Sequence, residues 1–130
     1  MKFHHIGIAC FNIKDTAKFY VELGYKKNEI VYDPIQNIYI CFLTKDNEPC
    51  IELLAPYDDK SPVKDILKKK GVSPYHLCYT VADIEKSVSD LVNNQDFIQI
   101  SDLSPAVAIN NKRVCFLFSK NTGLIELVEE

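Results

Sequence analysis

The chain has 130 residues, of which 47% are hydrophobic and 25% are charged, a composition typical of one soluble globular domain. Its formal net charge of -3 at pH 7 gives no electrostatic reason to expect a nucleic acid partner. No apolar run approaches the roughly 18 residues that a membrane span requires, and the N-terminus lacks a signal-peptide pattern. These features predict a cytoplasmic protein without a membrane partner.

The first elements are an apolar strand in "FHHIGIA" (Phe3–Ala9) and a helix after Asn12. Asn12 is a favourable N-cap, because its side chain accepts from the free amides of a first turn. The helix is predicted from about Ile13 to Leu23, with Gly24 just past its end, where a left-handed residue is common. Strands follow in "YICFLTK" and "CIELLAP", joined by a turn through residues 45–48.

A short connector helix is predicted within "DDKSPVKDILKKKG". Ser61 is placed to cap it, and Pro62 occupies the first helical position, where its missing N–H costs nothing. Three lysines in the last turn complement the helix dipole, and Gly71 follows them. This segment separates two halves of the chain.

The second half repeats the plan of the first. "HIGIACFNIKDTAKFY" aligns with "HLCYTVADIEKSVSDL", and "YICFLTK" and "CIELLAP" align with "VCFLFSK" and "LIELVEE". Asp83 takes the N-cap place of Asn12, and the last turn runs through residues 119–123. The sequence therefore predicts an α+β fold of two tandem β-α-β-β-β modules, residues 1–56 and 75–130, joined by a connector at 57–74 in a single domain.

Four polar residues occupy equivalent positions of the repeat: His5 and His76 in the first strands, Glu52 and Glu126 in the last. Taken singly, such residues are mostly structural. However, both glutamates have apolar neighbours on each side, and a buried carboxylate is costly unless it is paired or bound to a metal. Because the first and last strands of such a module can be neighbours, the four residues are candidate ligands of one divalent metal. Such a set leaves coordination positions open for substrate.

Adjacent His4 and His5 raise the question of which one belongs to this set. Alternation along a strand directs them to opposite faces, so both cannot reach one metal. In the second copy His76 follows Tyr75, which aligns with His4. The repeat therefore predicts His5 as the ligand and His4 as a packing or surface residue.

At these residues the chain resembles the vicinal oxygen chelate superfamily, whose metal ligands stand in "HIGIA", "IELLxP", "HIxxxV" and "IELVE" contexts. The resemblance spans nearly the whole chain, which has "HHIGIA", "IELLAP", "YHLCYTV" and "LIELVEE". It implies a curved mixed sheet around a metal site, with nickel, cobalt or zinc held by His5, Glu52, His76 and Glu126. It also implies a homodimer.

Two enzymes of this superfamily are most similar: glyoxalase I and methylmalonyl-CoA epimerase. The stretch from "SPVKDILKKKG" to "VADIEKSV" resembles the epimerase, but Ile35 stands where epimerases carry a proton-transferring glutamate. We therefore expect a glyoxalase I-like lyase (lactoylglutathione lyase) first, and an epimerase acting on an acyl thioester as the alternative. For the lyase, Glu126 is expected to move the carbon-bound proton of a methylglyoxal-thiol adduct, with Glu52 as the second acid/base.

Further expectations concern ligands and thiols. Lys112 and Arg113 are candidates to bind an anionic thiol cofactor, although basic loop residues are more often only solvated. A non-catalytic ligand-binding member of the superfamily is a second alternative, which the intact four-residue set disfavours. The five cysteines show no CxxC spacing and are interpreted as small buried apolar residues in a reducing compartment.

Overall fold

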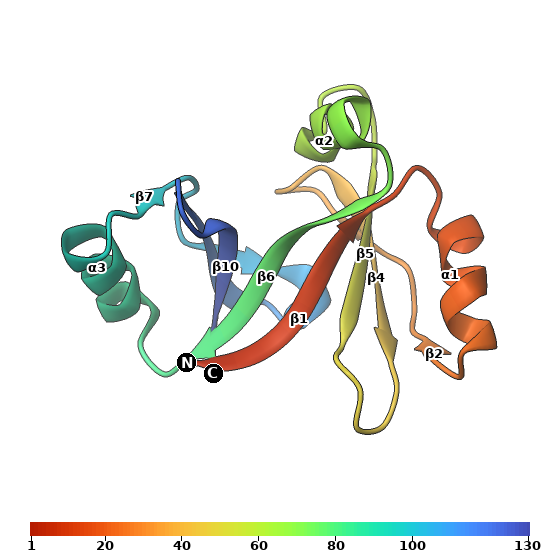
Figure 1. Cartoon of the computed structure of the whole chain (residues 1–130), viewed down its shortest axis with the longest axis horizontal. Helices are drawn as coiled ribbons and strands as arrows, with labels where there is room; N and C mark the ends of the chain where they lie inside the picture. Colours follow the sequence, from red (N-terminus) through yellow and green to blue (C-terminus); the bar gives the residue numbers. More distant parts are fainter. The chain divides into compact units, whose positions relative to one another are not determined.

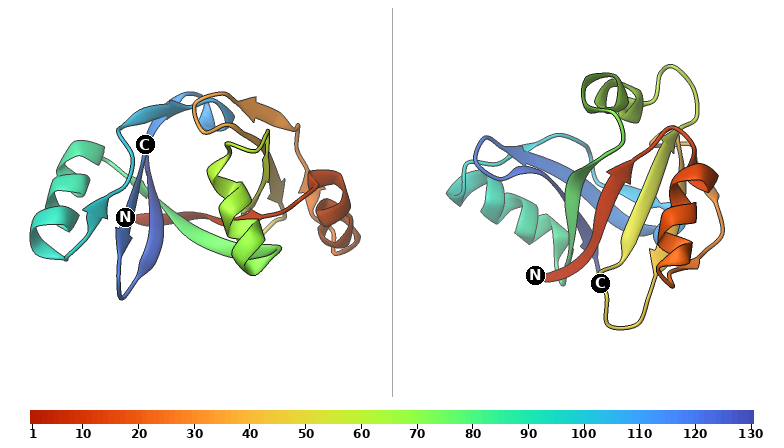
Figure 2. Two further views of the ribbon diagram at one scale, coloured as in Figure 1. Left: turned by 90° about the horizontal axis from the view of Figure 1, so that it is seen from above. Right: turned by 45° about the vertical axis from the view of Figure 1, so that its right-hand side comes forward.

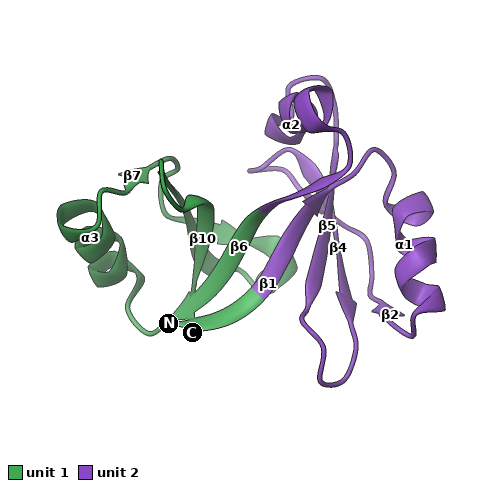
Figure 3. Ribbon diagram, in the orientation of Figure 1, with its two compact units in different colours: residues 1–4, 76–130 green, residues 5–75 purple.

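The computed structural model describes residues 1–130 and contains ten strands and three α-helices. The chain forms two compact units, which Figure 3 colours separately. Unit 1 comprises residues 1–4 and 76–130, and unit 2 comprises residues 5–75. No helix in the structure is both long and apolar enough to cross a membrane.

Unit 2 holds the first module and the connector helix (Figure 1). Its sheet has the order β2-β4-β5-β1, with β3 also paired to β4, and β1 runs parallel to β5 while the other pairs are antiparallel. The first residues of β1 belong to unit 1. The elements are β1 (Lys2–Ala9), α1 (Ile13–Glu22), β2 (Lys26–Lys27), β3 (Val31–Asp33), β4 (Ile38–Thr44), β5 (Ile51–Pro56) and α2 (Pro62–Lys70).

Unit 1 repeats this topology with the order β6-β10-β9-β7, and β8 also pairs with β9. Here β10 is parallel to β6 and antiparallel to β9. The elements are β6 (Ser73–Val81), α3 (Ile84–Asn94), β7 (Ile98–Gln99), β8 (Ser104–Ala106), a 3-10 turn (Val107–Ile109), β9 (Lys112–Ser119) and β10 (Gly123–Glu129). The predicted α+β class and the repeat are confirmed. Each unit has one short strand more than the predicted β-α-β-β-β pattern.

The helix ends follow the predicted signals in two of three cases. The Asn12 side chain accepts from the amide of Asp15 at 3.0 Å, and the Asp83 side chain accepts from Lys86 at 2.9 Å. Gly24 follows α1 with a φ of 97°, a left-handed conformation that glycine adopts without a side-chain clash. Ser61 precedes α2, but its side chain accepts no capping hydrogen bond. Pro62 therefore starts α2 without the predicted serine cap.

Helices α1 and α3 each cover one face of the sheet in their own unit. In unit 2, Ile13 and Ala17 of α1 pack on Leu53 of β5 and Cys41 of β4, and Figure 2 shows the orange helix beside these strands. In unit 1, α3 packs in the same way on β9 and β10 around Leu117. Because alternate residues of a strand point to opposite faces, residues next to these core positions face away from the helices. This places Glu52 and Glu126 on the faces opposite α1 and α3.

Candidate metal centre

In unit 2, the fold pairs His5 with Glu52. The two residues lie on the neighbouring parallel strands β1 and β5, where Gly7 is the register partner of Glu52. His5 Nε2 is 2.9 Å from Glu52 Oε2, and the residues are 0% and 3% exposed. Phe42 is the register partner of Glu52 on the other side, and its ring meets the imidazole edge-on with centroids 5.2 Å apart. An aromatic ring thus lies against the histidine of the buried pair.

In unit 1, His76 and Glu126 have the same arrangement. Glu126 on β10 pairs in register with Cys78 on β6, two residues beyond His76. His76 Nε2 is 3.4 Å from Glu126 Oε2, and the residues are 3% and 2% exposed. Phe116, opposite Glu126 on β9, stacks edge-on against the imidazole at 5.4 Å. The repeat seen in the sequence therefore extends to the geometry of each histidine-glutamate pair.

Both pairs offer donors that suit a divalent cation. A neutral imidazole nitrogen and a carboxylate oxygen are ligands that nickel, cobalt and zinc accept in proteins. A buried carboxylate is expensive without a compensating charge, and a cation supplies that charge. The burial and chemistry of His5, Glu52, His76 and Glu126 thus fit a metal. The predicted strands with both faces buried are confirmed for Glu52 and Glu126, since their neighbours on β5 and β10 are buried as well.

The remaining predicted residues lie elsewhere. His4 is half-buried, and one of its ring nitrogens lies within 4.8 Å of a ring nitrogen of His5. The choice of His5 over His4 as the metal ligand therefore stays a prediction. The Arg113 guanidinium binds Glu129 through Nε and Nη2 at 2.8 and 2.6 Å, and Glu85 through Nη1 at 2.9 Å. These carboxylates raise the pKa of Arg113 above its usual range. Lys112 starts β9 and is exposed. A role for Lys112 and Arg113 toward an anionic cofactor stays a prediction.

Ile35 lies in the turn between β3 and β4 and is 58% exposed. Its amide donates to the Asp33 carboxylate at 2.9 Å, and Asn37 completes the turn with a φ of 58°. The turn therefore carries no carboxylate at the place where the resembling epimerases have one. Phe42 and Phe116 had not been predicted as part of the centre. Their shared "CF" context in "YICFL" and "RVCFL" is the signal that points to them.

The cysteine interpretation agrees with the structure. All five are free thiols, and four of them are buried, with Cys50 half-buried. Burial raises the pKa of Cys10 to about 11 and that of Cys50 to about 11. Such thiols stay protonated near neutral pH and are weak nucleophiles.

Comparison with known proteins points to one family. Residues 4–116 match the glyoxalase/bleomycin resistance protein/dioxygenase superfamily. A mitochondrial methylmalonyl-CoA epimerase of Dictyostelium discoideum is 33% identical, over 99% of this chain and 78% of that protein. The structure of methylmalonyl-CoA epimerase from Mycobacterium tuberculosis has a TM-score of 0.86 at 26% identity, covering 98% of this chain and 87% of that one.

A Streptomyces coelicolor methylmalonyl-CoA epimerase, solved in complex with 2-nitronate-propionyl-CoA, has a TM-score of 0.84 at 26% identity. The match covers 100% of this chain and 97% of that chain. These relatives are similar over the full length, so the fold of both units is that of the epimerase structures. Among the two enzymes considered from the sequence, they favour the epimerase.

Proposed function

Because this chain belongs to the glyoxalase/bleomycin resistance protein/dioxygenase superfamily, we propose that it is an acyl-thioester epimerase of the methylmalonyl-CoA type. The observation that carries the proposal is the buried histidine-glutamate pair that recurs in each unit. Similar epimerases provide the substrate class, since one of them binds an acyl-CoA analogue. The reaction would invert the configuration of the carbon next to the thioester carbonyl.

We propose, as the resemblance implies, that His5, Glu52, His76 and Glu126 are the ligands of one divalent metal. A cation bound there would polarise the thioester carbonyl and so acidify the neighbouring C–H bond. The identity of the cation, among nickel, cobalt and zinc, is a matter for metal analysis. Phe42 and Phe116 contribute apolar walls that keep water from each pair, which strengthens charge interactions there.

Inversion requires proton transfer on both faces of the reacting carbon. In the proposed mechanism the Glu126 carboxylate removes the proton of the substrate carbon from one face. The electron pair of the broken C–H bond is then delocalised onto the thioester carbonyl. A proton delivered to the opposite face then gives the other epimer. Ile35 has no proton to give, so we assign this second role to Glu52. The resembling epimerases often have glutamine at the position of Glu52. In this proposal the carboxylate gained at position 52 compensates for the carboxylate that is absent at position 35.

A second candidate is the glyoxalase I-like isomerisation of a methylglyoxal-thiol adduct. Two features favour it: Ile35 in place of the epimerase glutamate, and a glutamate at position 52. This reaction also moves a proton between adjacent carbons, so the same pair of carboxylates would serve. We place it second because the similar full-length relatives described above are epimerases. A purely ligand-binding role stands third, because it gives the two buried pairs no use.

The decisive experiment follows both reactions with one metal-loaded preparation. In deuterated buffer, methylmalonyl-CoA should gain deuterium at the carbon between its two carbonyl groups and interconvert between epimers, both detected by NMR. In a separate assay, methylglyoxal and glutathione should give no thioester absorbance above the uncatalysed rate. Thioester formation without deuterium exchange would replace the epimerase with the lyase. Absence of both activities, despite bound metal, would leave only the binding role.

The predicted homodimer is tested independently. Light scattering on the eluting protein should give twice the mass of the 14.9 kDa chain. A mass of one chain would contradict the dimer without affecting the assignment of the reaction.

A further inference from the structure

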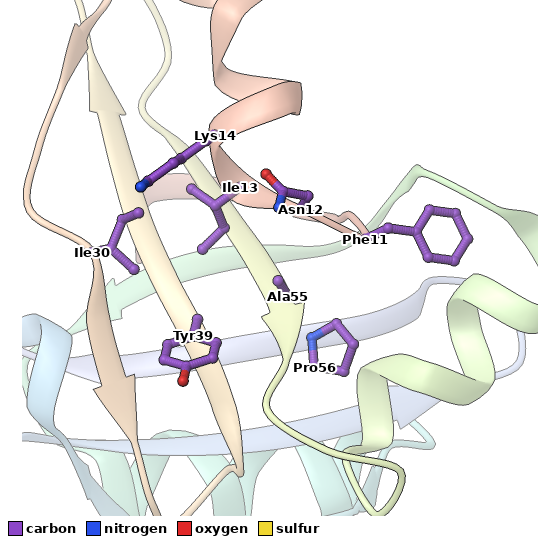
Figure 4. Close-up of a pocket in the computed structure, with 8 residues that line it drawn as sticks. All are labelled: Phe11, Asn12, Ile13, Lys14, Ile30, Tyr39, Ala55 and Pro56. Atoms are coloured by element: carbon purple, nitrogen blue, oxygen red, sulfur yellow. The ribbon is translucent and has the colours of Figure 1, made fainter.

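A cavity of about 350 Å³ opens on the helix-covered face of unit 2. Its walls come from the start of α1, from β4 and β5, and from the loop before β3 (Figure 4). Ala55 lies in the middle of the view, with Lys14 and Ile30 to one side of it and Phe11 to the other. Ala55 packs in the core beneath α1, whereas Glu52 faces away from α1. The cavity and the His5–Glu52 pair are therefore on opposite faces of the sheet of unit 2.

At the equivalent place of unit 1, charged side chains stand where unit 2 has three of these lining residues. Alignment of the two repeats gives three pairs of equivalent positions there: Lys14 with Glu85, Tyr39 with Arg113, and Ala55 with Glu129. In unit 1 these residues form one network, in which Arg113 binds both carboxylates at 2.6 to 2.9 Å. In unit 2 the side chain of Ala55 ends at Cβ, so the space occupied by the Glu129 carboxylate in unit 1 is left open.

The charge at this place is also inverted between the units. Lys14 stands where unit 1 has Glu85, and no carboxylate of the chain forms an ion pair with its ammonium group. Lys18, one turn further along α1, does have an acidic partner, Asp15, at 3.5 Å. The cavity thus combines a cation with the vacant position of a carboxylate.

Exposed aromatic rings line the same cavity as Lys14. Tyr39 lines the cavity and belongs to a cluster with Tyr32 and Tyr57, whose ring centroids lie 4.4 to 5.8 Å apart. All three tyrosines are exposed, and Phe11 at the cavity wall is 66% exposed. Exposed aromatic side chains that are clustered around a cavity provide apolar faces on which a planar ligand can stack.

We propose that this cavity binds a small anion that carries a planar aromatic ring. Its carboxylate or phosphate pairs with Lys14, and its ring packs over Ala55 against Tyr39 and Phe11. The anionic group of the ligand takes the place that the Glu129 carboxylate occupies in unit 1. Because the cavity lies on the opposite face of the sheet from Glu52, this site is independent of the proposed epimerase reaction.

Amide NMR on the full-length protein tests the site with three probes of one shape: 2-naphthoate, 2-naphthyl phosphate and the neutral 2-naphthamide. Either anion should cause saturable shifts at the amides of Lys14, Ile30 and Ala55. The neutral 2-naphthamide should bind about tenfold more weakly than the anions, which is the effect of losing one charge-assisted contact. The tighter of the two anions identifies the natural class as a carboxylate or a phosphate. Absence of saturable shifts with both anions overturns the proposal.

Three variants separate specific binding from adsorption to the surface. Lys14→Gln should weaken naphthoate binding about tenfold, because it removes the charge and keeps a polar side chain. Lys18→Gln, the matched control on the same helix, should bind as the unchanged protein does. Ala55→Glu copies unit 1 and should abolish binding by filling the cavity and pairing with Lys14. Equal affinity of Lys14→Gln and Lys18→Gln would also overturn the proposal, and thermal melts verify that each variant is folded.

Discussion

Glu126 lies with its Oε2 atom 3.4 Å from Nε2 of His76, on a strand that runs parallel to the strand of the histidine. Parallel pairing of the first and last strands of each module produces this contact, because it sets the glutamate two register positions beyond the histidine. His5 and Glu52 repeat the relationship at 2.9 Å in the other unit. A duplicated β-module thus supplies the same buried histidine-glutamate pair twice, once in each unit.

The first prediction concerns metal content. His76→Ala should lower the bound divalent metal well below that of the unchanged protein, because it removes one of four proposed ligands. Elemental analysis after dialysis against trace metal measures this directly. His4→Ala is the matched control: the repeat aligns His4 with Tyr75, which is not a proposed ligand, so its loss should leave metal content unchanged.

Interpretation of these variants depends on both results. Equal metal content in His76→Ala and the unchanged protein would contradict the metal assignment. A loss of metal in His4→Ala, with retention in His5→Ala, would instead reverse the choice between the two adjacent histidines. Thermal melts of the metal-free variants show whether either substitution unfolds the chain.

The second prediction separates the two proton-transferring carboxylates. Glu52→Gln should slow epimer interconversion by about 10²- to 10⁴-fold, the usual contribution of a general acid or base. Exchange of deuterium into one epimer should continue, since Glu126 still serves one face of the carbon. Glu126→Gln should preserve exchange into the opposite epimer only. NMR of each methylmalonyl-CoA epimer in deuterated buffer distinguishes these patterns.

A glutamate introduced at position 35 should partly replace the acid/base role proposed for Glu52. In the Glu52→Gln background, Ile35→Glu should recover part of the interconversion rate, because it restores the carboxylate that resembling epimerases have there. Ile35→Gln is the control of similar size without a base. If Glu52→Gln interconverts the epimers at the original rate with full metal content, Glu52 is not the second acid/base.

Much of this architecture follows from sequence alone, because the duplication can be read twice. Asn12 and Asp83 each predict a helix start, and both side chains form the expected cap. Buried glutamates at equivalent positions, each on the last strand of a module whose first strand carries a histidine, direct attention to the two pairs. Repetition raises the weight of a signal that would be weak in either half.

Other features depend on tertiary contacts that a sequence does not show. The short strands β2 and β7 have only two residues each, and the pairing with β4 and β9 defines them. Ser61 has the chemistry of an N-cap, yet its side chain makes no capping bond, so Pro62 alone marks the start of α2. The ion pairs of Arg113 with Glu85 and Glu129 join elements far apart in the chain, so the sequence does not show them, and its role toward an anionic cofactor stays a prediction. The preference for the lyase rested mainly on two positions, Ile35 and Glu52, against a likeness to epimerases over the whole chain.

The third prediction concerns the acid limb of stability. Hydrogen bonding to the Arg113 guanidinium lowers the pKa of Glu129 below its ordinary value. A carboxylate with a depressed pKa in the folded state stabilises the fold above its unfolded-state pKa, and this contribution is lost as pH falls through the folded-state pKa. Arg113→Leu should therefore be less stable than the unchanged protein at pH 7, and the gap should shrink toward pH 3.

Urea titrations at both pH values measure this gap. Lys112→Leu, the neighbouring exposed cation on β9, should show no comparable gap, because it forms no ion pair in the structure. A difference between Arg113→Leu and the unchanged protein that stays constant from pH 7 to pH 3 would assign the role of Arg113 to packing rather than charge.

The fourth prediction tests the core beneath α1. Leu53 is fully buried on the face of β5 that packs against Ile13 and Ala17. Leu53→Ala should lower the free energy of unfolding by about 2–5 kcal/mol, through lost apolar burial and the cavity left behind. Leu23→Ala makes the same chemical change at a site that is 49% exposed, and should cost about 0.5 kcal/mol or less. Denaturant unfolding of both variants compares them, and equal costs would mean that the contact between α1 and β5 adds little to stability.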